Sequence, residues 1–246
     1  LFSRNRHEVR LTPAGQVFFH EARRITRDLE AAIELGRAAA HGEVGKLRLG
    51  VGIATVHSLV PPALLKFRHQ HPNVDVQVTE MSTLSQVDAL LAGRIDVGFV
   101  RLPVKHEALS VVQVLSDRLT LVGSRHVAGP LNLKLLRDRP FVLIDRSVSS
   151  TYHDHCIALC ARAGFSPRVV QEAHEMFTLL NLVRAGIGVS LVPRSAMKMR
   201  VEGLKFAAVR DPHAEWDIGI AWNRAHESRL GKNFVEICLE AQGANL

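Results

Sequence analysis

Residues 46–100, KLRLGVGIATVHSLVPPALLKFRHQHPNVDVQVTEMSTLSQVDALLAGRIDVGFV, decide the fold. The first eight, KLRLGVGI, alternate between polar and apolar residues as a half-buried strand does. A helix is expected over 56–71, ending before Pro72, then a strand over 74–80, a helix over 84–92 and a strand over 95–100. This βαβαβ order is typical of a parallel sheet with helical crossovers, so the sequence predicts an α/β fold.

A second strand–helix series follows the first. It begins with two strands, expected over 110–115 and 118–123, with only Ser116 and Asp117 between them. The later elements of the series are a strand over 141–144, a helix over 151–163, a strand over 168–171, a helix over 175–185 and a strand over 189–192. Strands over 204–209 and 216–222 precede a last helix from about residue 228. Two such series, joined by a strand pair and closed by a returning strand, predict two lobes with a hinge.

The N-terminal segment, LFSRNRHEVRLTPAG, has a different pattern. Apolar residues flank a cationic stretch, which predicts a β-hairpin over 1–12 with a basic tip. Thr12 is expected to cap a helix whose first residue is Pro13, where the missing N–H costs nothing. A basic hairpin of this kind is suited to contacts with phosphates, and the candidate DNA-binding residues are Arg4, Arg6, His7 and Arg10.

The segment over 13–45 is expected to be a linker, formed by a long helix and a glycine-containing connection to the next unit. A helix from Pro13 to about His41 would span on the order of 40 Å, longer than a small domain is wide. Its small and apolar residues recur every three or four positions, at Ala14, Phe18, Ala22, Ile25, Leu29, Ala32, Gly36 and Ala39. So narrow a stripe on so long a helix favours pairing with the same helix of a second subunit over packing on its own domain.

Composition limits the classes of protein. The net charge of +7 points only weakly to nucleic acid, and the clustering of arginines at the N-terminus carries more weight than the total. Three cysteines argue against a disulfide framework and for a reducing, cytoplasmic compartment. No apolar run approaches the roughly 20 residues of a membrane helix, and no secretory signal opens the chain, so no membrane partner is expected.

Hydroxyl residues gather where the expected strands end and helices begin. Thr55 and Ser58 follow the first strand, Ser82 and Thr83 the next, and Ser149, Ser150 and Thr151 precede the helix that carries Tyr152. Helix N-termini offer free N–H groups and partial positive charge, which together favour a carboxylate ligand. Each group could instead only cap its helix, as Thr83 and Gln86 would in a T-x-x-Q capping box.

The sequence gives weaker support to metal, redox or enzyme chemistry. His153, Cys156 and Cys160 could share a helix face as metal or redox ligands, but helical cysteines are more often small buried residues. The thirteen histidines are scattered without the spacing of a site, and Asp96 is expected to form an ion pair beside Arg94. Residues 50–55 lack the third glycine of a dinucleotide fingerprint, and no motif of a nucleophile elbow, a phosphate-binding loop or a zinc protease occurs, so no cofactor is expected.

The motifs together resemble the LysR-type transcriptional regulators. The landmarks are LF-x-R with LTPAG at the N-terminus, then GKLRLGV, VPPALLKFRHQHPNVDVQVTEM, LLAGRIDVGFVRLP and LVRAGIGVSLVP. The sequence GFVRL over 98–102, with EM-x-T over 80–83, is similar to the branch that responds to benzoate, muconate and chlorinated catechol products. The resemblance begins inside the wing of a winged helix-turn-helix, so that most of that domain is expected to be missing from these 246 residues.

The resemblance implies a two-lobed, type II periplasmic-binding-protein-like effector domain behind a wing remnant and a linker helix. It implies that lobe I is discontinuous, over 46–115 and 217–246, and that lobe II, over 116–216, is inserted in it. It places an organic acid, aromatic or muconate-like, in the cleft between the lobes. With Ser82 from the helix-start argument, the candidate effector-binding residues are Ala54, Thr55, Ser82, Thr83, Arg101, Thr151, Tyr152 and Met176. The implied partners are double-stranded DNA and further copies of the chain in a homodimer or homotetramer. Contact with RNA polymerase is left open.

Two rival functions remain at this point. A transport-type solute-binding protein would have the same lobes, although the basic hairpin and long helix argue against it. An enzyme on this scaffold would use the His/Cys cluster, but the pattern as a whole predicts a regulator rather than an enzyme.

Overall fold

The structure, a computed structural model, describes residues 1–4 and 9–243. Its N-terminal unit contains a hairpin and one long helix. Strands β1 (Phe2–Arg4) and β2 (Val9–Leu11) pair antiparallel, with Phe2 opposite Leu11. The Thr12 hydroxyl accepts a hydrogen bond from the Gly15 N–H at 3.0 Å, and helix α1 (Pro13–His41) follows. The predicted hairpin, N-cap and helix are confirmed, although Arg6 and His7 lie outside the described residues.

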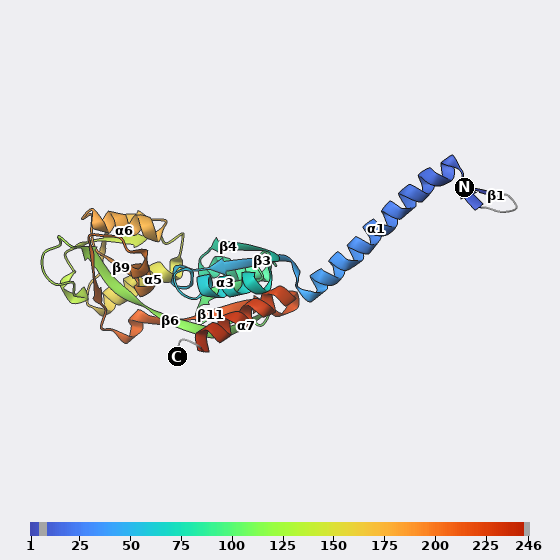
Figure 1. Ribbon diagram of the computed structural model, residues 1–246. Helices are drawn as coiled ribbons and strands as arrows, with labels where there is room; N and C mark the ends of the chain where they lie inside the picture. The colour runs from blue at the N-terminus through green and yellow to red at the C-terminus, as the bar shows by residue number, and fades with distance from the viewer. Residues whose placement is uncertain (5–8, 244–246) are drawn as a thin grey trace. The chain divides into compact units, whose positions relative to one another are not determined.

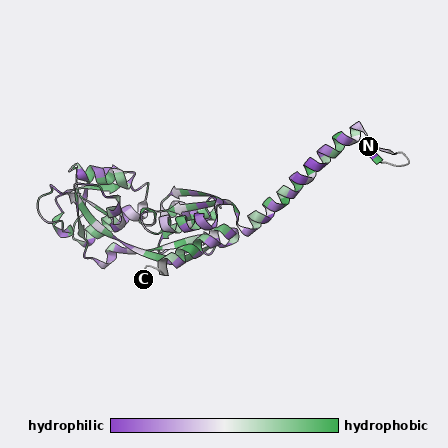
Figure 2. Ribbon diagram, in the orientation of Figure 1, coloured by the Kyte–Doolittle hydropathy of each residue, from purple (hydrophilic) through white to green (hydrophobic). Residues whose placement is uncertain are grey.

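Helix α1 carries apolar side chains in contact with solvent. Hydrophobic and hydrophilic segments alternate along it in Figure 2. Its large exposed hydrophobic residues are Val17, Phe18, Phe19, Ile25, Leu29, Ile33 and Leu35. Phe18, Ile25 and Leu29 belong to the stripe expected from the sequence. Exposure of so many apolar side chains on one helix is unfavourable in water, and it agrees with a helix that needs a partner.

The rest of the chain contains a seven-stranded sheet and a separate two-stranded sheet. In Figure 1 the long strand β6 (Leu109–Ser124) runs between two groups of helices and strands. One end contains, in spatial order, β4 (Asn73–Glu80), β3 (Val44–Val51), β5 (Val97–Arg101), β11 (Glu215–Asn223) and β6 (Leu109–Ser124). Strands β3 and β5 run parallel, while β11 is antiparallel to both β5 and β6. Three helices belong to this end: α3 (Val60–Gln70), α4 (Thr83–Leu91) and α7 (Arg229–Gly243).

Aromatic rings join two of these helices to the sheet. The Phe234 ring of α7 lies 5.6 Å from the Phe67 ring of α3 and 6.4 Å from the Phe99 ring of β5, edge to face in both pairs. All three rings are buried. The C-terminal helix therefore completes the hydrophobic core that the first βα units begin.

At the other end of the sheet, β6 continues between β10 (Leu204–Ala208) and β9 (Ser190–Pro193). Strands β7 (Pro140–Ile144) and β8 (Arg168–Ala173) form a parallel pair, and Phe141 of β7 bridges to Val189 beside β9. Helices α5 (Ser150–Arg162) and α6 (Met176–Arg184) pack on these strands around a large apolar cluster. The remaining helical turns are α2 (Ile53–Val56), η1 (Leu133–Leu135), η2 (Arg194–Met199), η3 (Pro212–Ala214) and η4 (Arg224–His226).

Two expected elements differ from the structure. Strands 110–115 and 118–123 are one strand, β6, because Ser116 and Asp117 stay extended opposite Asp217 and Trp216 of β11. The expected helix over 56–71 is divided into α2 and α3. Pro61 and Pro62 occupy the first turn of α3, where a missing N–H is tolerated, whereas a helix continuing from α2 would need those N–H groups.

The partner of Asp96 also differs from the prediction. Its carboxylate accepts hydrogen bonds from the Arg48 N–H at 2.7 Å and from the Arg48 guanidinium at 2.7 and 3.2 Å, and not from Arg94. The predicted ion pair exists with another arginine, because Arg48 lies on the adjacent strand β3. Among the described residues, none of the helices is both long and apolar enough to cross a membrane.

Candidate functional site

A cavity of about 450 Å³ opens where the two ends of the sheet meet. Its walls come from the carboxyl ends of β3, β4 and β5 and from the first turns of α2, α4, α5 and α6. All eight candidate residues line it: Ala54, Thr55, Ser82, Thr83, Arg101, Thr151, Tyr152 and Met176. The crevice at strand ends, expected for an open α/β sheet, is present in this chain.

The start of α4 forms one wall, with a cap that differs from the predicted one. Ser82 is the N-cap, and its hydroxyl accepts from the Ser85 N–H at 3.3 Å. The Thr83 hydroxyl instead accepts from the Arg101 N–H at 3.0 Å, and Gln86 Nε2 donates to the Met81 carbonyl at 3.0 Å. The alternative of a Thr83–Gln86 capping box is therefore wrong, because both side chains bond to backbone groups outside α4.

The start of α2 forms another wall, and its hydroxyl groups form hydrogen bonds with the backbone of the same turn. The Thr55 hydroxyl donates to the Gly52 carbonyl at 2.9 Å and accepts from the Gly52 N–H at 3.3 Å, and its side chain is buried. Ser58 donates its hydroxyl proton to the Ala54 carbonyl. Thr55 lines the cavity, but its oxygen is already engaged in fixing the β3–α2 turn.

Arg101 places a cation in the cavity wall. Its guanidinium lies over the Trp216 ring, 4.3 Å from the centroid, and donates a hydrogen bond to His155 Nδ1. Burial lowers the pKa of Arg101 by removing water from the cation, but a guanidinium in a protein stays charged. Within the described part of the chain, no carboxylate lies at ion-pair distance from Arg101. A half-buried cation without an anionic partner is a characteristic of an anion-binding site.

The apolar part of the cavity comes from helices α5 and α6. Tyr152 is buried and donates its hydroxyl proton to the Leu191 carbonyl, and burial raises the pKa of this phenol well above its ordinary value. Met176 begins α6 and is also buried, while Thr151 is exposed at the cavity surface.

Sequence reasoning missed several further lining residues. Phe99 and Trp216 come from strands that the sequence placed correctly, and Met199 comes from η2, but no functional signal in the sequence marked them. A cation–π partner cannot be recognised from spacing alone, because Arg101 and Trp216 are joined only by the pairing of β5 with β11.

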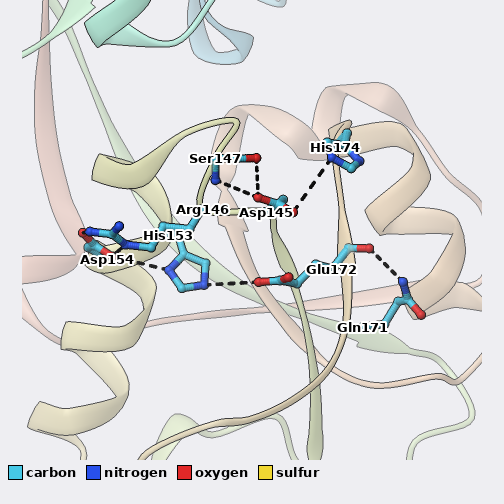
Figure 3. A network of polar contacts seen from close by, with 8 residues as sticks. All are labelled: Asp145, Arg146, Ser147, His153, Asp154, Gln171, Glu172 and His174. Carbon is cyan, nitrogen blue, oxygen red and sulfur yellow. Dashed lines mark hydrogen bonds and ion pairs between the residues drawn. The ribbon is translucent and has the colours of Figure 1, made fainter.

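A polar network lies beside the cavity, at the ends of β7 and β8 (Figure 3). Asp145, just after β7, accepts two hydrogen bonds from Ser147, and these bonds lower the pKa of its carboxyl. His174, which follows β8 and lines the cavity, approaches Asp145 at 3.9 Å. Asp154 forms two hydrogen bonds with the Arg146 guanidinium, at 2.8 and 2.9 Å. These contacts order the loop that leads into α5.

The candidate metal or redox residues point to different surroundings. His153 faces the carboxylates of Asp154 and Glu172 in the network of Figure 3, at 3.5 and 3.8 Å. Cys156 and Cys160 are buried, and desolvation raises the pKa of each thiol to about 12. The described residues contain no group of three or more His, Cys, Asp or Glu side chains that could hold a metal ion.

With this geometry established, the chain can be compared with known proteins. The family model of the LysR substrate binding domain matches residues 40–243. The HTH-type transcriptional regulator AlsR of Bacillus subtilis is 32% identical over 244 residues, which cover 96% of this chain and 80% of AlsR. The relatives carry the names of transcriptional regulators rather than enzymes.

Two solved structures are similar along most of the chain. Full-length CbnR in complex with its target DNA is 28% identical, with a TM-score of 0.76 over 98% of this chain and 84% of CbnR. The BenM effector binding domain with its effector benzoate is 25% identical, with a TM-score of 0.66 over 82% of this chain and 93% of that domain. The chain therefore belongs to the LysR family of transcriptional regulators, with the two-lobed, type II periplasmic-binding-protein-like fold of its effector-binding domain.

Proposed function

We propose that the cavity binds a small organic carboxylate, aromatic or muconate-like, as the effector that controls this regulator. The observation that carries the proposal is Arg101, a half-buried cation at the cavity wall with no anionic partner among the described residues. The first turns of α4, α5 and α6 add N–H groups and the positive ends of three helix dipoles. A carboxylate would supply the missing negative charge.

The other walls suit an unsaturated or aromatic body. Tyr152, Met176, Phe99 and Trp216 line the cavity and offer flat or polarisable apolar surface. The similarity to the BenM domain, whose structure contains its effector benzoate, supports the same class of ligand. Among the cavity residues, Thr83 and Ser82 would face the carboxylate from the start of α4, with Thr151 opposite on α5.

The proposed mechanism uses two lobes, residues 46–115 with 217–246 and residues 116–216. Every buried residue of the larger apolar cluster lies within the second of these ranges, and the smaller cluster of Ala89, Leu90, Ile95, Val100, Leu109 and Ala221 lies within the first. Each lobe thus has its own core. An effector that contacts both lobes favours one relative position, and it can shift this equilibrium only by binding one state more tightly.

The proposed readout is the geometry of a DNA-bound oligomer. In this proposal the wing over 1–12 contacts DNA phosphates or the minor groove through Arg4, Arg6, His7 and Arg10, which adds affinity more than base discrimination. The linker over 13–45 pairs two subunits through the exposed apolar residues of α1, and dimers associate into a homotetramer. The similarity to CbnR, whose full-length structure contains its target DNA, supports the DNA-binding part of this proposal.

Calorimetric titration with benzoate and with cis,cis-muconate tests the effector. We expect at least one acid to bind, and Arg101→Ala to reduce its affinity by at least tenfold, because a charge-assisted hydrogen bond to a carboxylate is lost. Ser195→Ala, in η2 outside the cavity lining, is the control and should bind as the parent does. Binding of neither acid, or binding unchanged in Arg101→Ala, contradicts the proposal.

Light scattering tests the linker. Ile25→Glu and Leu29→Glu should reduce the oligomer to smaller species, because each places a charge in the proposed apolar seam. Glu30→Lys, which changes charge on the polar side of the same helix, should leave the molar mass unchanged. Equal molar masses for all three variants would exclude α1 as the interface.

A further inference from the structure

His155 connects three separate elements behind the cavity. It lies on α5, and its Nδ1 accepts a hydrogen bond from Arg101 Nη2 of β5. Its Nε2 donates to the carbonyl of His213 in η3. Its ring also meets the Trp216 ring edge to face, with centroids 5.7 Å apart and an interplanar angle of 73°. His155 is not one of the residues that line the cavity.

These contacts determine the state of the imidazole. A guanidinium can only donate, so Nδ1 must present its lone pair to Arg101, and a carbonyl can only accept, so Nε2 must carry the proton. The neutral Nε2–H tautomer satisfies both partners, whereas the imidazolium would have no acceptor for Arg101. The side chain therefore acts as a fixed acceptor for one N–H group of the arginine.

Arg101 is consequently restrained at both ends. Its backbone N–H is held by the Thr83 hydroxyl, and its guanidinium is held between the Trp216 face and His155. Fixing a free arginine side chain costs rotamer entropy. When the fold fixes the side chain beforehand, a ligand does not have to do so on binding, and its affinity is greater.

We propose that His155 is a positioning residue for effector recognition, which holds the guanidinium of Arg101 over Trp216 so that its remaining N–H groups receive a carboxylate in the cavity. The proposal rests on the proposed function of the cavity. It differs from it in one respect: His155 contributes to affinity without touching the effector. The contribution should appear only for ligands that carry a carboxylate.

The experiment compares benzoate with its neutral isostere benzamide in calorimetric titrations of the full chain. His155→Leu should reduce benzoate affinity by about tenfold and change benzamide affinity by less than twofold, because only the carboxylate requires the positioned guanidinium. His155→Asn, whose Oδ1 stands near the position of Nδ1, should retain benzoate affinity to within about threefold. His213→Leu removes an adjacent imidazole but keeps the carbonyl that His155 contacts, and should bind both ligands as the parent does.

The outcomes separate this inference from the proposed function. If Arg101→Ala loses benzoate binding while His155→Leu retains it, the cavity assignment stands and the positioning role is wrong. If the parent binds neither benzoate nor cis,cis-muconate, both proposals are wrong. Nitrogen NMR of the parent gives a test that does not depend on the folding of a variant: benzoate, but not benzamide, should shift the His155 Nδ1 resonance, and an unshifted resonance would overturn the positioning role.

Discussion

The Thr83 hydroxyl, in the first residue of α4, accepts a hydrogen bond at 3.0 Å from the backbone N–H of Arg101, the last residue of β5. One side chain thus links two walls of the cavity.

We expect Thr83→Val to lower the free energy of unfolding by about 1–3 kcal/mol, because a partly buried N–H loses its partner. The same variant should weaken benzoate binding, as measured by urea unfolding and calorimetry. Thr83→Ser, which keeps the hydroxyl, should be close to the parent in both; equal behaviour of the valine and serine variants would show that the bond is unimportant.

Gly50 of β3 leaves room for two neighbouring side chains, those of Ile95 and Gln86. A Cβ at this position would lie 2.7 Å from Ile95 Cδ1 and 3.0 Å from Gln86 Cγ. We expect Gly50→Ala to lower the free energy of unfolding by about 1–3 kcal/mol, since both neighbours would have to move in a filled core. Gly52→Ala is the matched control, because a Cβ there meets nothing within 4 Å. Thermal unfolding of the two variants gives the comparison, and similar losses in both would contradict the steric explanation.

The cysteines should be chemically silent in the folded protein. Cys156, Cys160 and Cys238 are buried, and burial raises the pKa of each thiol to about 12. Only the thiolate attacks disulfide reagents, so at pH 8 the reactive fraction is on the order of 10⁻⁴. We expect Ellman's reagent to modify all three in urea and none within minutes in buffer. Rapid modification of the native protein would reopen a redox role for Cys156 and Cys160.

Stability should decline in acid because three aspartates are held in their ionised form. The Ser147 hydroxyl lowers the pKa of Asp145, the Arg146 guanidinium that of Asp154, and the His213 N–H that of Asp211. Since each folded-state pKa lies below the ordinary value of 3.8, the unfolded chain binds more protons in that range. The stabilisation is therefore complete above about pH 5 and is lost as the pH falls through the folded-state values.

Urea unfolding between pH 7 and pH 3 measures this dependence. Ser147→Ala should reduce the loss of unfolding free energy with falling pH, because the pKa of Asp145 moves back toward its ordinary value when the hydroxyl is removed. Asp138→Asn, at an exposed carboxylate with no side-chain hydrogen bond or ion pair among the described residues, should leave the slope unchanged. A slope that is the same in Ser147→Ala and in the parent would refute the assignment to Asp145.

Local signals in the sequence predicted most of the fold. Helix α1 begins at Pro13 and ends at His41 as expected, because its cap at Thr12 and the glycine after it act within one turn. The continuity of β6 could not be predicted in this way. It depends on the pairing of Ser116 and Asp117 with residues of β11 that lie about a hundred positions away along the chain.

The residues of the candidate site also differ in whether local sequence could reveal them. Residues at strand ends and helix starts, such as Thr83 and Thr151, could be found because their place follows from the order of elements and from the family resemblance. His155 could not, since its contacts with Arg101 and His213 cross 54 and 58 positions of sequence. Its significance comes from its neighbours in space, and a histidine among thirteen gives no sign of them.

The single strand β6 has a mechanical consequence. Its pairing with β11 has a register shift between Ile218 and Gly219, close to the proposed boundary between the lobes. A ribbon of two strands twists more readily than a wide sheet. Reorientation of the proposed lobes would therefore be a torsion distributed along this ribbon rather than a bend at a loop. Substitutions around the register shift would change the free-energy cost of that torsion, and with it the response of the regulator to its effector.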